Sequence, residues 1–247
     1  MGIVRSGVCR CLLLVVFIGL SACSSRGLVK AGIDIDKAQA PTKLVVVTPD
    51  FVIHELNLGK SQERVVQWEN NAATAFERSV INLSDKENKF AVVGMAELSQ
   101  AERDTFIQHR ALFATMVPQL LQIKSGAVAV WAKEAKKFNY TLGPGLAGFK
   151  ESHGADAVVF VVGKDTIRSG SRIALDMINS FLPGAQSLEA QQAYLVAGIA
   201  DLATGDLLLF DYDAAKRKQL SNEKDVQKMA DEVLTDYKRF IKQNSWF

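Results

Sequence analysis

Short runs of apolar, largely β-branched residues recur along the chain, and each predicts a strand of a buried sheet. Apolar side chains at consecutive positions are typical of strands that are covered on both faces. The three clearest runs are residues 43–48, 90–94 and 155–163. Pro49 should end the first run, because proline has no amide hydrogen to give to a strand ladder.

Residues 191–200 and 206–212 predict two further strands that pair as a hairpin. Thr204 and Gly205 lie between them and supply the turn, since glycine adopts a positive φ without steric cost.

Between the strands, apolar residues spaced three and four apart predict amphipathic helices. One apolar stripe runs over residues 65–83, with Ser61 as the expected N-cap of its helix. A second helix should begin after Ser99, because Ser99 and Glu102 match the capping box. Pro118 should kink this helix or end its first part.

Two more helices are expected in the second half of the chain. Pro144 suits a first helical position and Gly154 the residue after a helix end. A closing helix should be capped by Ser221 or Asn222. Its buried stripe should comprise Val226, Met229, Val233, Tyr237, Phe240 and Ile241. Residues 127–138 fit either a helix or a strand.

The order of these elements predicts one α/β domain over residues 43–247. Its core should be a mixed sheet of about five strands flanked by helices. An insertion over residues 164–190 should separate the two strongest strands.

The N-terminal residues resemble a bacterial lipoprotein signal. Arg5 and Arg10 give the first ten residues a positive charge, and residues 11–20 form an apolar run. Ten residues are too short to cross about 30 Å of hydrocarbon as a helix. The tetrad Leu20-Ser21-Ala22-Cys23 then resembles a lipobox. Residues 1–22 should therefore be removed, Cys23 should carry the lipid, and residues 23–42 should form a tether. The alternative is an ordinary secretory signal with a chance cysteine.

Maturation changes the charge and thiol content of the chain. The whole sequence has 29 basic and 27 acidic residues, and the signal contains two of the basic ones and no acid. A mature chain with equal numbers of basic and acidic residues is formally neutral, so its overall charge does not favour binding to nucleic acid. Cys9 and Cys11 lie within the signal, so Cys23 is the one cysteine left. A lipidated Cys23 leaves no disulfide, thiolate metal site or cysteine nucleophile.

Motifs that would indicate catalysis or cofactor binding are weak. Residues 143–148 fit G-x-G-x-x-G, but Pro144 lacks the amide that a phosphate would use, and the following helix is short. His54, His109 and His153 have no metal-ligand spacing, and no G-x-S-x-G marks a serine nucleophile. We therefore expect no catalytic residue, no metal and no cofactor. Asp211 and Asp213 are expected in solvated turn positions.

The insertion is the main candidate for a partner-binding surface. Its first residues are polar and include a glycine, and the residues after them predict a short amphipathic helix. Long loops on rigid scaffolds often bind partners. The candidate contact residues are Arg168, Arg172, Ile173, Met177 and Phe181. The alternative is that this helix packs back on the core.

Several features together resemble a group of envelope proteins: the TolB amino-terminal domain, the curli-secretion lipoprotein CsgG, and lipoproteins that activate peptidoglycan synthases. The features are the lipobox, the first strand, the motif Gly154-Ala155-Asp156, the turn at residues 201–205 and the closing helix. The resemblance implies a non-enzymatic binding or assembly factor without a cofactor, which binds an envelope protein or itself.

The same resemblance implies attachment to the outer membrane through the lipid, facing the periplasm, because Ser24 and not aspartate follows Cys23. The alternatives are a self-assembling secretion or transport component of the outer membrane and, less favoured, an envelope hydrolase.

Replacement of Cys23 tests the predicted anchor. Cys23→Ala should leave the precursor without acyl label, because no thiol remains to accept the lipid. Metabolic labelling with a fatty acid measures this directly. A variant that still incorporates the label would contradict the prediction.

Overall fold

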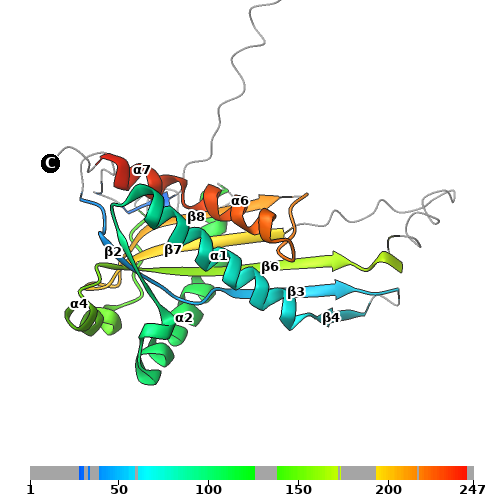
Figure 1. Ribbon diagram of the computed structural model, residues 1–247, viewed down its shortest axis with the longest axis horizontal. Coiled ribbons are helices and arrows are strands. Elements are labelled where there is room, and N and C mark those ends of the chain that lie inside the picture. The colour runs from blue at the N-terminus through cyan, green and yellow to red at the C-terminus, as the bar shows by residue number, and fades with distance from the viewer. Residues whose placement is uncertain are drawn as a thin grey trace, which may run out of the picture.

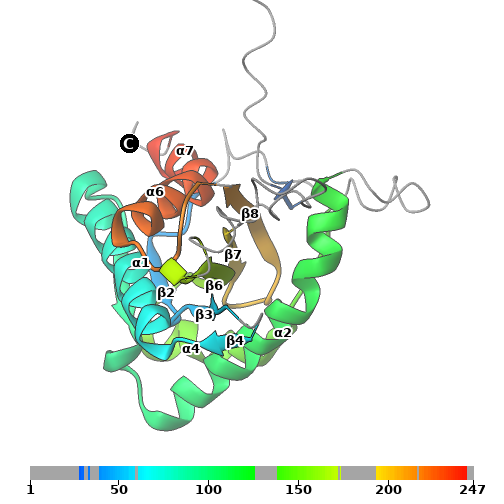
Figure 2. The same cartoon turned by 90° about the vertical axis from the view of Figure 1, so that its right-hand side faces the viewer.

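The computed structural model describes residues 28–30, 33, 39–58, 61–125, 138–171, 173, 193–215 and 217–243. These residues form a mixed sheet with helices on both faces, so the predicted α/β class is confirmed (Figure 1). Helices α1, α6 and α7 cover one face, and α2 and α4 lie on the other (Figure 2).

The described part of the chain contributes eight strands to the sheet, where about five were expected. The strands are β1 (Leu28–Val29), β2 (Lys43–Val46), β3 (Asp50–Leu56), β4 (Gln62–Arg64), β5 (Ala91–Gly94), β6 (Ala157–Arg168), β7 (Ala193–Asp201) and β8 (Leu207–Ala215). Their order is β1-β8-β7-β6-β2-β5, and β3 pairs with both β6 and β4. The three strands missed in the sequence are β1, β3 and β4, which are short or carry polar residues.

Strands β2 and β3 lie one after the other along the same edge of β6. Leu44 of β2 is in register with Ala157, and Asp50 of β3 with Val162, both parallel. Pro49 occupies the gap between the two strands. The proline interrupts the ladder as expected, but the chain resumes its path along β6 because Phe51 and Ile53 are buried on the core side.

The helices create two hydrophobic cores, one on each face of the sheet. They are α1 (Val66–Glu87), α2 (Gln100–Lys124), α4 (Ala147–His153), α6 (Glu223–Val233) and α7 (Thr235–Gln243), with 3₁₀ turns η2 (Met95–Glu97) and η3 (Pro144–Leu146). Phe76 and Tyr237 are fully buried in the first core, and Phe106 and Phe113 in the second. None of the helices in the described ranges is both long and apolar enough to cross a membrane.

The capping predictions for the first two helices have different outcomes. Ser99 and Glu102 form the expected capping box at the start of α2. Ser61 is not a cap: strand β4 follows it, and α1 begins at Val66 without a side-chain cap. Helix α2 continues through Pro118 to Lys124, so the proline does not end it.

The turn and cap predictions in the second half are confirmed. Pro144 opens η3, and Gly154 ends α4 in the left-handed region with φ 58°. Gly205 has φ 74° in the β7–β8 turn, where a Cβ would overlap the carbonyl of Gly143. Asn222, rather than Ser221, accepts the amides that begin α6. All six residues of the predicted closing stripe are buried, although Leu234 divides that helix into α6 and α7.

The segment predicted as a tether is partly built into the domain. Leu28 and Val29 pair with β8. Ala40 belongs to the first core, and Ile33 packs against it. The hydroxyl of Tyr237 donates to the carbonyl of Pro41 at 3.1 Å. The predicted tether of residues 23–42 is therefore too long, because the chain already joins the sheet at Leu28. Of residues 127–138, only Phe138 lies within the described ranges, and it is buried.

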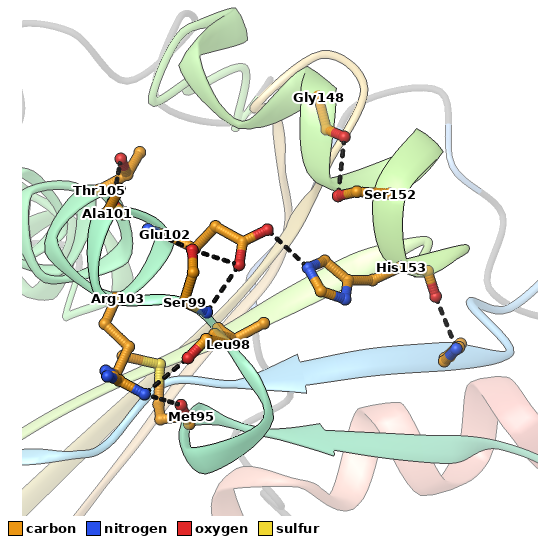
Figure 3. Close-up of polar contacts among 11 residues, drawn as sticks. Met95, Leu98, Ser99, Ala101, Glu102, Arg103, Thr105, Gly148, Ser152 and His153 are labelled. Atoms are coloured by element: carbon orange, nitrogen blue, oxygen red, sulfur yellow. Dashed lines mark hydrogen bonds and ion pairs between the residues drawn. The ribbon is translucent and has the colours of Figure 1, made fainter.

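A polar network joins the start of α2 to the end of α4 (Figure 3). The carboxylate of Glu102 accepts from the amide and hydroxyl of Ser99, at 2.8 and 2.7 Å, and from Nε2 of His153, at 2.7 Å. The carbonyl of His153 accepts from Nζ of Lys43 at 2.6 Å, which extends the network to β2. The bonds from Ser99 and then His153 lower the pKa of Glu102 to about 2.

This network should make stability depend on pH. The pKa of Glu102 is below its ordinary value of 4.5. The stability that its charged form contributes is therefore present above pH 4.5 and lost as the pH falls toward about 2. Glu102→Gln should lower the melting temperature at neutral pH and flatten its decline between about pH 5 and pH 2. Thermal melts across that range measure both effects.

Glu151→Gln is the matched control, since Glu151 is exposed on α4 and lies outside this network. If both variants follow the same pH profile as the unaltered protein, the network does not contribute.

Candidate partner-binding surface

One end of the sheet extends beyond helix α2 (Figure 1). We call this end the distal ribbon and define it as residues 50–58, 61–64, 162–171 and 173. It consists of β3, β4 and the second half of β6, with the turns that follow them. The register holds these strands together, because β3 pairs with β6 up to Leu56 and Arg168 while β4 pairs with the far edge of β3.

The two faces of the distal ribbon differ in their cover. On the α1 side, alternate residues of β6 stay buried as far as Ile167. On the other face, β6 is buried at Val158 and Phe160 but becomes half-buried or exposed from Val162 onward. Helix α2 therefore covers the first part of this face and leaves the rest open among the described residues.

The open face combines apolar, cationic and hydrogen-bonding side chains. Lys164 of β6 is exposed and stands in register with Val52 of β3 and Tyr194 of β7. The next pair on the same face is His54 and Thr166, both half-buried. Nδ1 of His54 is buried without a hydrogen-bond partner among the described residues. Such a mixture is typical of an interface more than of a solvated sheet face.

The tip of the ribbon exposes two aliphatic side chains. Backbone bonds close the tip: the amide of Ser169 donates to Leu56, and the amide of Ile173 donates to Ser169, at 3.1 and 2.9 Å. Leu58 is 49% exposed and Ile173 is 50% exposed. The tip therefore places apolar surface in solvent next to the open face.

An ion pair fixes the ribbon to helix α1. Arg64 donates to both carboxylate oxygens of Glu69, at 2.7 and 2.9 Å, and the amide of Ile53 donates to the same carboxylate at 3.0 Å. Burial alone would raise the pKa of Glu69, but the bonds from Arg64 and Ile53 outweigh it and lower the pKa. The carboxylate thus holds β3, β4 and α1 together in its charged form.

A second buried carboxylate connects β6 to the loop before α6. Asp165 is fully buried, and its Oδ2 accepts from the amide of Leu220 at 2.9 Å. Burial raises its pKa, and the amide bonds only partly offset this effect. On its α1 face the ribbon is therefore held by two buried carboxylates beside the apolar core, while its other face stays open.

Two of the five predicted contact residues lie at this surface. Arg168 is the last residue of β6, and Ile173 is at the exposed tip. Arg172, Met177 and Phe181 lie outside the described residues, as do Cys23 and the whole signal. The predicted start of the insertion was too early, because residues 164–168 continue β6.

The sequence analysis missed the contribution of β3 to the surface. Phe51 and Ile53 alternate with half-buried Val52 and His54, which is the period-two pattern of a strand. That signal was hidden by Pro49 before it and by the charged residues after it.

The three histidines lie on three different elements of the fold. They stand on β3, α2 and α4, and His109 contacts its own helix through Thr105 O at 2.8 Å. In a serine triad the histidine lies between hydroxyl and carboxylate. Here Ser99 and His153 both bind Glu102 instead (Figure 3).

Asp211 and Asp213 both lie in strand β8, where Asp213 is half-buried and pairs with Lys218. Asp211 is buried and paired with Lys124, so the expectation that it is solvated was wrong. No group of three His, Cys, Asp or Glu side chains in the described ranges could hold a metal ion.

No known family model matches the chain, and no curated protein matches it. Among solved structures, lipoprotein GNA1162 from Neisseria meningitidis shares 12% identity over 70% of this chain and 81% of that chain, with a TM-score of 0.30. The C-terminal domain of LpoB from Salmonella enterica shares 14% identity over 73% of this chain and 86% of that chain, with a TM-score of 0.26. Similarity at this level carries no inference about function, and the resemblance to the TolB and CsgG group stays a prediction.

The Glu69 clamp can be tested by a neutral substitution. Glu69→Gln should destabilise the protein by about 1 kcal/mol, because it loses the charged bonds to Arg64, whose side chain is 55% exposed and therefore screened by solvent. Urea unfolding of the full chain measures the difference. Glu63→Gln on the same ribbon is the control, since Glu63 is exposed, and an equal effect of both variants would contradict the clamp.

Proposed function

We propose that this protein is a lipid-anchored lipoprotein of the bacterial envelope that captures an envelope protein partner on its distal ribbon. The anchor is the acylated Cys23, and Ser24 after it favours the outer membrane with the domain in the periplasm. The contact residues are Arg168 and Ile173 together with Arg172, Met177 and Phe181 of the segment that follows.

The open face of the distal ribbon is the observation that carries this proposal. A sheet face beyond the cover of its helices exposes apolar surface at a cost of about 25 cal/mol per Å². Leu58 and Ile173 at the tip add two half-exposed aliphatic side chains to it. A partner that covers this surface recovers that free energy, and Lys164 and Arg168 favour an acidic rim on the partner.

A role without catalysis fits the chemistry of the same region. Two buried carboxylates at the ribbon serve the fold: Glu69 of α1 binds Arg64, and Asp165 binds the amide of Leu220. Since these carboxylates already hold structural partners, we propose binding and not hydrolysis as the activity.

Site-specific photo-crosslinking in intact cells tests the proposal. A photoreactive residue at Lys164 should give a discrete adduct, whereas one at Ile107 should not, because Ile107 is similarly accessible at 42% exposure but lies on α2. Adding Ile173→Asp should reduce the Lys164 adduct by about tenfold, since it places a charge in an apolar contact.

The mass of the adduct distinguishes the partner. An adduct of twice the chain mass would indicate the alternative function, a self-assembling secretion or transport component. No adduct at Lys164, or equal adducts at both positions, would contradict the proposed surface.

A further inference from the structure

The two buried carboxylates at the distal ribbon differ in their counter-charge. Glu69 accepts from the amide of Ile53 at 3.0 Å and also binds the guanidinium of Arg64. Asp165, which is in register with Ile53, accepts from the amide of Leu220 at 2.9 Å. In the described part of the chain Asp165 has no cation as a partner. The two sites therefore share a backbone donor, but only one of them compensates the charge.

The site around Asp165 suits a neutral carboxyl group. Asp165 is fully buried, and its Oδ1 has no hydrogen-bond partner among the described residues. A buried carboxylate without a cation costs far more free energy than a buried carboxylic acid. Burial accordingly raises the pKa of Asp165, and backbone amides offset only part of this effect. The folded protein therefore favours the protonated side chain.

The charged groups on the elements around Asp165 do not supply the missing partner. Lys218, two residues before Leu220, is bonded to Asp213 of β8 at 2.5 Å. Asp225 of α6 accepts from the amide of Gln219 at 3.2 Å. The buried or half-buried titratable groups of β3 and α1 toward this side are acids, namely Glu55, Glu69 and Glu77. A charge on Asp165 would thus stay uncompensated.

The Asp165–Leu220 contact joins the longest strand of the ribbon to the loop before α6 (Figure 1). Leu220 is fully buried in the first core and belongs to residues 217–222, which follow β8. Asp165 lies between Lys164 and Thr166 on β6. Because neighbours along a strand point to opposite faces, both of those side chains are on the open face. A displacement of Asp165 would therefore move the partner-binding surface.

We propose that a proton on Asp165 controls how firmly the distal ribbon presents its open face. The inference rests on the proposed function, since it regulates the surface named there. With the proton in place, the neutral side chain stays buried and holds the loop to β6. When the proton leaves, the uncompensated charge draws Asp165 toward water and releases the amide of Leu220.

The direction of the pH effect follows from the raised pKa of Asp165. A raised pKa contributes stability that is fully present below the ordinary value of 3.8 and is lost as the pH rises through the raised value. The Asp165–Leu220 contact should therefore weaken at higher pH. This is opposite to Glu102, whose contribution is lost as the pH falls.

Hydrogen exchange of the full-length protein, followed by NMR at two amides, tests the inference. Each rate is divided by the intrinsic rate at the same pH, so that only structural protection is compared. From about pH 5 to pH 8 the protection of the Leu220 amide should fall about tenfold. The Ile53 amide is the internal control and should stay protected, because its acceptor Glu69 has a lowered pKa and remains charged.

Asp165→Asn should make the protection of Leu220 independent of pH. The asparagine oxygen still accepts from the amide, but the side chain cannot ionise. The Leu220 and Ile53 amides of the unaltered protein decide the matter even where this variant does not fold.

Three results would overturn the inference. Constant protection at Leu220 would show that no proton controls the contact. An equal fall at Ile53 would assign the change to loosening of the whole ribbon. A fall that persists in Asp165→Asn would assign it to another carboxyl group whose pKa burial raises, Glu77 or Asp211.

The Lys164 photo-crosslink, repeated in isolated envelopes at both pH values, separates this inference from the proposed function. The adduct should weaken at the higher pH in the unaltered protein and not in Asp165→Asn. An adduct that stays constant while Leu220 loses protection would overturn the control of the surface. Absence of the adduct at both pH values would contradict the proposed function, and the Leu220 amide would still decide whether the proton controls the ribbon.

Discussion

Strand β6 has neighbouring strands on both edges, with one interruption between Val159 and Val162, and the positions of the other layers depend on it. Strand β7 pairs along one edge, and β2 and then β3 pair along the other. Helix α2 covers only the first part of one face, so β6 changes from buried on both faces to buried on one. The open surface of the distal ribbon is therefore a consequence of strand length, because β6 and β3 continue where α2 does not.

The other end of β6 is closed by polar contacts that leave little freedom. The carboxylate of Asp156 accepts from the amide and hydroxyl of Thr42, at 2.9 and 2.8 Å, and from the amide of Lys43 at 3.1 Å. Burial would raise its pKa, but these bonds outweigh it and lower the pKa. Together with the Glu102–His153 contact they join β2, α2 and α4 at one place. One end of the sheet is thus fixed internally, and the opposite end keeps an open face.

Local signals predicted the parts of this fold that depend on neighbouring residues. The capping box at Ser99, the left-handed glycines Gly154 and Gly205, and the central run of β6 follow from backbone and packing rules that act over a few residues. The α/β class followed from their order.

Strands β1, β3 and β4 could not be predicted in the same way, because distant partners stabilise them. Leu28 is a strand residue only because β8 offers an edge at Phe210. The open face likewise depends on which helix ends where, and no short motif encodes that. The sequence marked Arg168 and Ile173 as contact residues, but the placement of Val52 and His54 on the same surface required the register of β3 on β6.

The proposed partner should cover the distal ribbon in the cell. Hydroxyl-radical footprinting compares the purified protein with the same protein in intact envelopes and reads accessibility at single side chains. A covered ribbon should show reduced labelling of Leu58 and Ile173 in the envelope, with Ile107 and Leu112 on α2 labelled equally in both samples. Unchanged labelling of Leu58 and Ile173 would contradict it.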